Sequence, residues 1–223
     1  MYYFGLVSLI LFIFKMKIVA ISDTHGRHAD IVLPKGDLLI HAGDVSSRGT
    51  RAQVTDFIDW YARQPHKHKI FIAGNHDFFF EKADVQEIKE LIPEGISYLN
   101  DSGVEIEGVK FWGSPVTPWF YNWAFNRDRG AEIKQHWDLI PEDTQVLITH
   151  GPPSKILDKT VRGELTGCEE LLSTVLRINP RYHIFGHIHE GQGSYTHKET
   201  SFFNVSVLDH HYKVQHPPTI IEI

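Results

Sequence analysis

Short apolar runs recur along the chain, and most of them end at glycine or at a polar side chain. Unbroken apolar character of this kind is typical of strands that are buried on both faces of a sheet. We predict strands over residues 17–22, 37–41, 69–73, 145–149, 182–185, 202–207 and 219–223. Three shorter runs, at 96–99, 104–107 and 109–112, have glycine at their turns and predict an antiparallel meander.

Helical spacing separates several of these strands. Val54, Phe57, Ile58 and Tyr61 fall at i, i+3, i+4 and i+7 and predict a helix over 50–63. Further helices are predicted over 85–92 and near 168–178, with capping boxes at Asp84/Glu87 and at Thr166/Glu169. Strands that alternate with helices predict parallel strands joined by crossover helices. In such sheets the ligand site lies beyond the carboxyl ends of the strands.

Polar side chains follow five of the predicted strands at that edge. They are Asp23 with His25, Asp44, Asn75 with His76, His150, and His187 with His189. Residues i and i+2 of an extended segment point the same way, so we expect Asp23 with His25, and His187 with His189, to converge as pairs. One such residue is ordinary in a turn. Five strand ends of this kind indicate a binding site.

The chemistry of these groups favours two metal ions. Seven ligands are too many for one ion with an open position, whereas two ions that share Asp44 leave a positive, unsaturated centre. Such a centre binds a phosphate ester and lowers the pKa of a bridging water to make hydroxide. Mixed nitrogen and oxygen ligands favour Mn²⁺, Fe or Zn²⁺ over Ca²⁺ or Mg²⁺.

Composition narrows the class of protein. A chain of 223 residues with 42% hydrophobic residues can form a packed core, and we predict a single domain over 16–223. The net charge of −6 and the lack of a dense basic block argue against a protein that coats long nucleic acid. The one cysteine, Cys168, excludes an intrachain disulfide and fits a reducing compartment. We therefore expect a cytoplasmic protein.

Residues 1–15 form an apolar N-terminal extension that is too short for a spanning helix of about 20 residues. Three interpretations stay open. The start is mis-called and Met16 is the true one, the segment is a membrane anchor, or it is an atypical signal that lacks the usual basic region. Only the anchor would make the protein membrane-associated.

The order of these motifs resembles that of the calcineurin-like metallophosphoesterases. The matching motifs are Asp23-x-His25, Gly43-Asp44, Gly74-Asn75-His76-Asp77, His150 and Gly186-His187-x-His189. Further features, among them His150-Gly151-Pro152-Pro153, are similar to the metallophosphoesterase-domain-containing branch, which is related to class III cyclic-nucleotide phosphodiesterases. The resemblance implies a four-layer αββα sandwich of two mixed sheets, with a dinuclear metal site at the C-terminal strand edge.

The resemblance also implies a role for each matching residue. It assigns Asp23, His25 and His189 to the first metal, Asn75, His150 and His187 to the second, and Asp44 to both. His76 would point away from the metals toward the leaving group as general acid, and Asp77 would fix its tautomer, as a carboxylate does for a working imidazole.

These expectations define a dinuclear metal-dependent phosphoesterase. Its substrate partner would be a small phosphodiester, with cyclic nucleotides among the candidates, or a phosphomonoester. The attacking group would be a metal-bridging hydroxide. Two alternatives stay open: a nuclease of the same fold, and a metal-binding scaffold without turnover. The sequence gives no indication of the oligomeric state. We interpret Arg27 and His28 as solvated loop residues and the aromatic stretch 119–125 mainly as packing.

Overall fold

The computed structural model describes residues 16–223, so the predictions for residues 1–15 lie outside the described residues. Its strands form two large mixed sheets. The first has the order β13 (Thr219–Glu222), β1 (Lys17–Ile21), β2 (Leu38–Ala42), β3 (His68–Ile72), β4 (Ile96–Tyr98). The second has the order β11 (Gly193–His197), β12 (Thr200–Asn204), β10 (Tyr182–Phe185), β9 (Val146–Thr149), β6 (Val109–Ser114), β5 (Ser102–Ile106). A short ribbon pairs β7 (Thr117–Pro118) with β8 (Asn126–Arg127).

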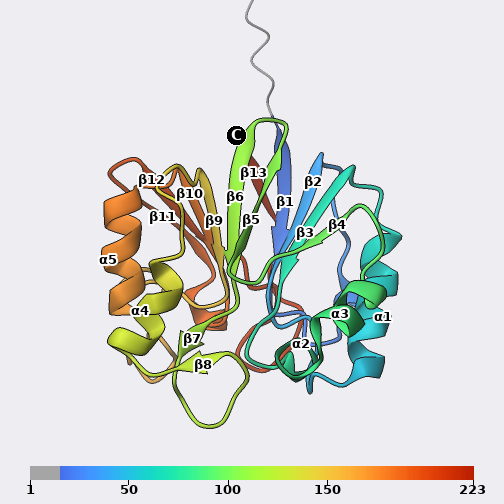
Figure 1. Ribbon diagram of the computed structural model, residues 1–223, viewed down its shortest axis with the longest axis horizontal. Coiled ribbons are helices and arrows are strands. Elements are labelled where there is room, and N and C mark those ends of the chain that lie inside the picture. Colours follow the sequence, from blue (N-terminus) through green and yellow to red (C-terminus); the bar gives the residue numbers. More distant parts are fainter. Residues whose placement is uncertain (1–15) are drawn as a thin grey trace, which may run out of the picture.

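Helices flank the two sheets on their outer sides (Figure 1). On the side of the first sheet are α1 (Arg51–Ala62), α2 (Phe78–Lys82) and α3 (Val85–Leu91), and on the side of the second are α4 (Ala131–Trp137) and α5 (Glu169–Ile178). Two 3-10 turns, η1 (His28–Asp30) and η2 (His189–Gly191), lie in the loops. The arrangement confirms the predicted αββα sandwich.

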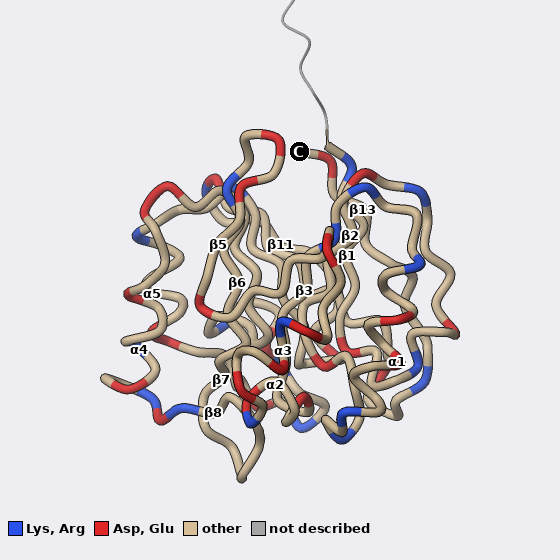
Figure 2. Tube along the Cα trace, turned by 45° about the vertical axis from the view of Figure 1, so that its right-hand side comes forward, with Lys and Arg blue, Asp and Glu red and all other residues tan. Residues whose placement is uncertain are grey.

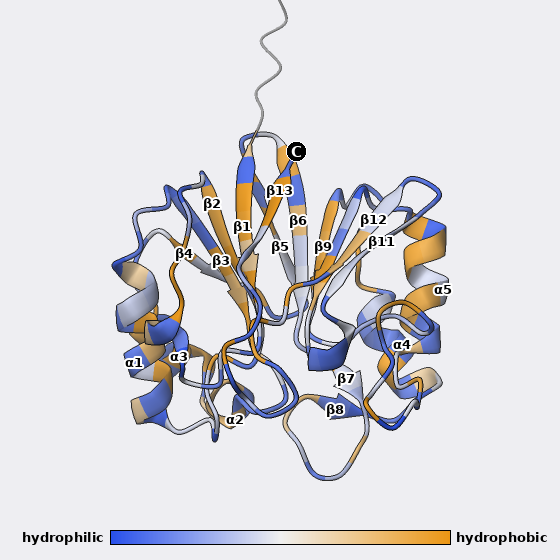
Figure 3. Cartoon of the chain, turned by 180° about the vertical axis from the view of Figure 1, so that it is seen from behind, coloured by the Kyte–Doolittle hydropathy of each residue, from blue (hydrophilic) through white to orange (hydrophobic). Residues whose placement is uncertain are grey.

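Alternation along each strand explains the layers. In β1, Ile18 and Ala20 point into the core between the sheets, whereas Val19 points to the helices of the first sheet. In β9, Val146 and Ile148 enter the central core and Leu147 packs toward α4 and α5. Both faces are therefore buried, which is why these strands read as continuous apolar runs. Figure 3 shows hydrophobic residues concentrated in the central strands, among them β1, β2 and β9.

Of the two predicted helix caps, the one at Asp84 is present and the one at Thr166 is not, and the structure adds a cap at Thr50 that was not predicted. Thr50 accepts a hydrogen bond from the Gln53 amide at the start of α1, and Asp84 accepts one from the Glu87 amide at the start of α3. The predicted cap at Thr166 is wrong, because the Thr166 hydroxyl donates to the Asp158 carbonyl instead. Cys168 takes the capping position of α5.

The predicted meander over 96–112 is also wrong in part. β5 and β6 do pair as an antiparallel hairpin, but β4 lies parallel to β3 in the other sheet. The chain therefore crosses from the first sheet to the second after β4, which places the two halves of the predicted meander in different layers. Local patterns cannot distinguish these outcomes, because strand partners are chosen over long distances in sequence.

The two ends of the described chain lie together at the edge opposite the carboxyl ends of β1, β2 and β3 (Figure 1). Backbone hydrogen bonds join Met16 and Ile223 in both directions, at 2.9 and 3.0 Å. Lys and Arg are interspersed with Asp and Glu along the loops and helices (Figure 2). None of the helices within residues 16–223 has the length and apolar character that a membrane crossing requires.

Candidate metal centre

Five parallel strands end in loops that meet at one point between the two sheets. The loops after β1, β2 and β3 bring in residues from the first sheet, and those after β9 and β10 bring in residues from the second. Their ligand atoms form overlapping clusters, within 4.8 Å of one another in each: Asp23/His25/His189, His25/Asp44/His76 and Asp44/His150/His187. The predicted convergence at the strand edge is thus present.

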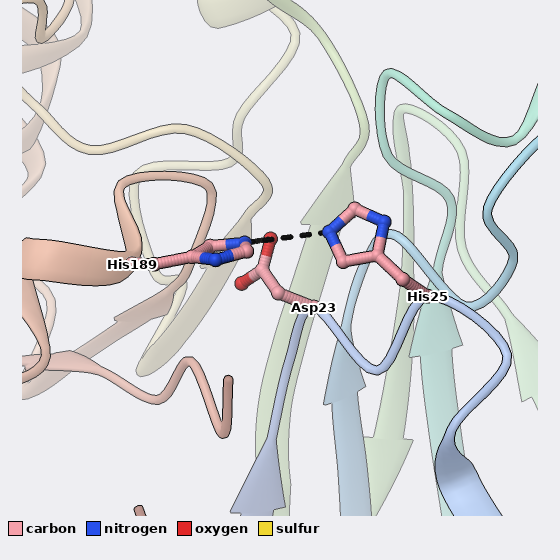
Figure 4. A group of neighbouring side chains, drawn as sticks. All are labelled: Asp23, His25 and His189. Atoms are coloured by element: carbon pink, nitrogen blue, oxygen red, sulfur yellow. Dashed lines mark hydrogen bonds and ion pairs between the residues drawn. The ribbon is translucent and has the colours of Figure 1, made fainter. Parts of the chain in front are cut away.

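We call Asp23, His25 and His189 the first group (Figure 4). The Nε2 atoms of His25 and His189 face each other at 3.3 Å. Nε2 of His189 lies 3.6 Å from Oδ1 of Asp23. Nε2 of His25 lies 3.6 Å from Oδ2 of Asp44, which therefore adjoins this group.

Asn75, His150 and His187 form the second group. Nε2 of His150 lies 2.9 Å from Oδ1 of Asn75 and 3.4 Å from Oδ2 of Asp44. The His187 ring stands 5.0 Å from the His150 ring, centroid to centroid, and crosses it at 62°. Asp44 is within reach of both groups through the same carboxylate oxygen, Oδ2.

Backbone carbonyls aim two of these imidazoles at the centre. Nδ1 of His150 lies 3.0 Å from the Ala42 carbonyl, and Nδ1 of His189 lies 2.9 Å from the Asp209 carbonyl. A carbonyl only accepts, so each Nδ1 carries the hydrogen and the lone pair of the neutral ring is on Nε2. A metal-binding histidine is typically held in this way. The buried Nε2 atoms face one another and the neighbouring carboxylates, so the site fits a cation.

Without a cation the same cluster holds protons. Burial acts to lower the pKa of His150, but Asp44 outweighs it and raises the pKa to about 9. Burial acts likewise on His189, and its contact with Asp23 raises the pKa to about 9. In turn, burial acts to raise the pKa of both carboxyl groups, and His189 beside Asp23 and His150 beside Asp44 hold those pKa values below the usual range. The negative carboxylates therefore stabilise positive charge at this site.

Asp23 is fully buried and is fixed by both sheets. Its carboxylate accepts hydrogen bonds from the Ser206 hydroxyl at 2.7 Å and from the His187 amide at 3.0 Å. Asp23 and His25 converge as expected, but the predicted reason is wrong: both have positive φ, at 57° and 45°, so the segment is not extended. A tight left-handed turn, and not strand alternation, brings the two side chains together.

Glycine is required beside the ligands. A Cβ on Gly74 would collide with the Asp44 carboxylate and would lie 2.7 Å from Cε1 of His150. A Cβ on Gly186 would collide with the Asp23 carboxylate. Real Cβ contacts are not this short, so the glycines before Asn75 and His187 allow the strand ends to approach the ligands.

Comparison with known proteins agrees with this geometry. A family model described as calcineurin-like phosphoesterase matches residues 16–191. The chain belongs to the calcineurin-like phosphoesterase family. It is 40% identical over 230 residues to the human metallophosphoesterase domain-containing protein 1, in an alignment that covers 93% of this chain and 71% of that protein.

A second relative of this chain carries a name that states no activity. A UPF0046 protein of Caenorhabditis elegans is 38% identical over 220 residues, covering 93% of this chain and 75% of its own length. A solved crystal structure superimposes with a TM-score of 0.63 at 17% identity, covering 93% of this chain and 99% of that chain. The last likeness supports the fold alone.

His76 stands at the rim of the calcineurin-like centre. Its ring is 4.2 Å from the Trp123 ring and 4.5 Å from the His25 ring, between centroids. Nδ1 of His76 lies 2.9 Å from the Ser47 carbonyl, and its backbone amide donates to Oδ1 of Asp44 at 2.8 Å. The ring lies beside the ligands His25 and Asp44 and also lines the cleft, so its orientation toward a leaving group stays a prediction.

The predicted partnership of Asp77 with His76 is wrong. The Asp77 carboxylate is buried and accepts hydrogen bonds from the amides of Val45, Ser46 and Gly74, at 2.9 to 3.0 Å, and from the Ser46 hydroxyl at 2.6 Å. It joins the loop after Asp44 to the loop before Asn75. The Ser47 carbonyl takes the tautomer-fixing position that was expected of Asp77, because the i+1 neighbour of His76 points into the protein.

A cleft of about 770 Å³ opens over the centre. Aromatic side chains of the segment between β7 and β8 line one part of it: Trp119, Phe120, Tyr121 and Trp123. The loop 160–166 and Tyr212 line it as well. Phe120 is 5.1 Å from the His187 ring, so the aromatic segment contacts the ligands directly and does more than pack. Tyr212 was not predicted, and no motif in its neighbourhood would have identified it.

Two residues that we interpreted as solvated differ in their surroundings. His28 is buried, with its ring against Phe57 and Trp60, and Nε2 lies 3.2 Å from the Asp56 carboxylate. Arg27 is partly exposed, and its guanidinium donates to the Tyr212 carbonyl at 2.8 Å. Neither residue lines the cleft, so the structure assigns them to the support of the loops around the centre.

Proposed function

We propose that this protein is a dinuclear metal-dependent phosphoesterase that acts on a small phosphodiester or phosphomonoester. The observation that carries the proposal is the shared position of Asp44. One carboxylate oxygen lies 3.6 Å from a nitrogen of the first group and 3.4 Å from a nitrogen of the second. Two adjoining ligand sets around one carboxylate fit two cations better than one.

The ligand roles follow from the two groups. Asp23, His25 and His189 would hold one cation, and Asn75, His150 and His187 the other, with Asp44 between them. The donor set of imidazole nitrogens and oxygens favours Mn²⁺, Fe or Zn²⁺. When bound, such a pair supplies positive charge that neutralises a phosphate ester and acidifies a water.

His76 is the proton donor in this proposal. Its Nδ1–H is directed at the Ser47 carbonyl, so Nε2 is left to carry the proton that moves to a leaving oxygen. The flanking rings of His25 and Trp123 hold the imidazole at the edge of the cleft. Asp77 supports this arrangement indirectly, because it ties the Asp44 loop to the loop that carries His76.

The cleft supports a small substrate. Its volume of about 770 Å³ exceeds that of a phosphate group alone, so an organic group is accommodated beside the centre. Among the described residues that line the cleft, the Lys and Arg side chains are Arg129 and Arg162. Arg129 already donates to the carbonyls of Thr166 and Gly167. So little free positive charge disfavours a nuclease that acts on long polymers.

The first experiment measures metal content and hydrolysis together. Purified protein reconstituted with Mn²⁺, Fe or Zn²⁺ is expected to hold close to two ions per chain and to cleave bis-p-nitrophenyl phosphate, and a chelator is expected to abolish cleavage. Parallel assays on cyclic nucleotides and monoesters define the preferred ester. Two ions without turnover would favour the scaffold alternative. Steeply salt-dependent cleavage of oligonucleotides would favour the nuclease.

The second experiment tests the proton donor. His76→Ala is expected to retain both ions and to lose about 10²- to 10⁴-fold in rate on esters with poor leaving groups. The loss should be far smaller on p-nitrophenyl esters, because p-nitrophenolate leaves without a proton. His197→Ala, at an exposed position on β11, is the matched control and should match the wild type on both. Equal losses on both esters would remove His76 from the role.

A further inference from the structure

The segment Asp209–Lys213 lies after the part of the chain that the family model matches, which ends at residue 191. It forms a closed turn. The Asp209 amide donates to the Lys213 carbonyl and the Tyr212 amide donates to the Asp209 carbonyl, both at 2.9 Å. The Asp209 carboxylate accepts the amides of His211 and Lys213, also at 2.9 Å. We call this segment the C-terminal turn.

The C-terminal turn contacts the first group at two points. The Asp209 carbonyl accepts the Nδ1 hydrogen of His189. The Tyr212 ring meets the His25 ring edge-on, with centroids 4.9 Å apart, and the His189 ring in the same manner at 5.4 Å. The turn therefore both orients one ligand and places an aromatic side chain over the group.

Tyr212 is held in an unfavourable backbone conformation. Its φ of 59° lies in the left-handed region, which residues other than glycine rarely adopt. Arg27 stabilises it, because its guanidinium donates to the Tyr212 carbonyl at 2.8 Å and also pairs with Asp30. Conformations of this kind persist where surrounding contacts impose them, and they are frequent at functional sites. Arg27 thus links the loop of the first motif to the C-terminal turn.

The Tyr212 hydroxyl has no hydrogen-bond partner within residues 16–223. The side chain is about half exposed, at 49%, and it lines the cleft together with His25, Asp44 and His189. A phenol is neutral and can donate one hydrogen bond, so it adds a donor beside the carboxylates without adding charge. An oxyanion in the cleft is a natural acceptor.

We propose that Tyr212 contacts the substrate by donating its phenolic hydrogen to a non-bridging oxygen of the phosphoester bound next to the first group. This inference rests on the proposed function and extends it. The C-terminal turn thereby makes Tyr212 a specificity-determining residue for a tetrahedral oxyanion. The phenol ring itself packs against the histidines of the first group, whereas the aromatic segment contacts the second group through Phe120 and His187.

The test uses the full chain, loaded with Mn²⁺, and the variant Tyr212→Phe, which retains the ring. Isothermal titration with inorganic phosphate is expected to show about 10-fold weaker binding. Steady-state hydrolysis of bis-p-nitrophenyl phosphate is expected to lose about 10- to 100-fold in kcat/KM, as for a hydrogen bond to a charged group. Metal content and the thermal midpoint should stay unchanged. Tyr195→Phe is the matched control, since Tyr195 is 48% exposed and lies outside the cleft.

The outcomes separate this inference from the proposed function. Normal phosphate binding and kinetics in Tyr212→Phe overturn the contact and leave the function standing. Weaker phosphate binding by the variant, in a protein that hydrolyses no ester, supports the contact and refutes the function. Loss of metal in Tyr212→Phe shows that the side chain acts through the ligands, which overturns a direct contact. A loaded wild-type protein that binds no phosphate overturns it as well.

Discussion

The first and second groups of ligands differ in what holds them. His150 of the second group is fully buried, and its ring is anchored directly to a sheet through Ala42, the last residue of β2. His189 retains 7% of its accessible surface, and its ring is anchored to Asp209 in the C-terminal turn. The ring of His150 is therefore oriented by the fold itself, whereas the first group is completed by a peripheral segment. We expect the first cation to be the more easily lost.

Removal of the shared carboxylate should have the largest effect, because it affects both groups. Asp44→Asn keeps the shape but loses the charge that adjoins His25 and His150. Loss of a group that only hydrogen-bonds a metal ligand lowers metal affinity by about 10- to 100-fold. We expect a larger fall for Asp44→Asn, with both cations lost after gel filtration. Metal analysis checks this, with Asp143→Asn on the exposed surface as control. Retention of two ions would contradict the sharing.

Metal binding should release protons from both groups. Because the pKa values of His150 and His189 are raised to about 9, each ring is protonated below that pH in the metal-free protein and must lose a proton when a cation binds. Apparent affinity should therefore rise with pH up to about 9, by about ten-fold per pH unit for each proton released. Calorimetry in buffers of different ionisation enthalpy counts the protons. His189→Asn should remove one of the two; an unchanged count would contradict the assignment.

Loss of one histidine from each group tests the comparison directly. His189→Asn should leave one tightly held cation and a nearly unchanged thermal midpoint. His150→Asn should disturb both cations and should also lower the free energy of unfolding of the metal-free chain by about 1–3 kcal/mol, because a buried polar contact is lost. Urea unfolding and metal analysis of both variants measure the difference. If the two variants behave alike, the groups are held equally and the comparison fails.

A buried histidine without a carboxylate partner provides a reference for both groups. Burial lowers the pKa of His183 to about 3, below its value of about 6.5 in the unfolded chain. The unfolded state therefore takes up a proton that the folded state refuses, so stability should decrease as the pH falls from about 6.5 toward 3. The slope is about 1.4 kcal/mol per pH unit. In urea unfolding at several pH values, His183→Gln should remove the contribution of one proton to this slope, and His197→Gln should leave the slope unchanged.

Much of the scaffold could be predicted because its strands are buried on both faces. Apolar runs such as 69–73 stand out from their surroundings, and the observed β3 covers nearly the same residues. The short helices α2 and α4 were missed, since three consecutive phenylalanines hide any helical period in α2, and α4 lies behind an aromatic stretch. The partner of β4 was wrong because pairing depends on packing between distant segments.

The candidate site could be predicted as a set of residues but not as a set of contacts. Strand ends that carry Asp23, Asp44 and His150 are visible in sequence because their positions follow from the fold rule for parallel sheets. The contact of His76 with the Ser47 carbonyl, in place of the expected contact with Asp77, could not be predicted, since it depends on how two loops cross. The position of Tyr212 depends on a turn that begins 20 residues after His189, and only folding brings this turn to the first group.

The hydrogen bonds between Met16 and Ile223 have a practical consequence for handling the molecule. The two residues are adjacent across the antiparallel pair of β1 and β13, at the edge opposite the cleft. In a variant chain that is made to begin at Met16 and end at Ile223, a short linker could join the two residues in a circular permutant whose new ends open at an exposed turn elsewhere, with the ligand loops left intact. The same geometry suits immobilisation: a tether at Ile223 would attach the protein to a sensor surface with the cleft facing the solution.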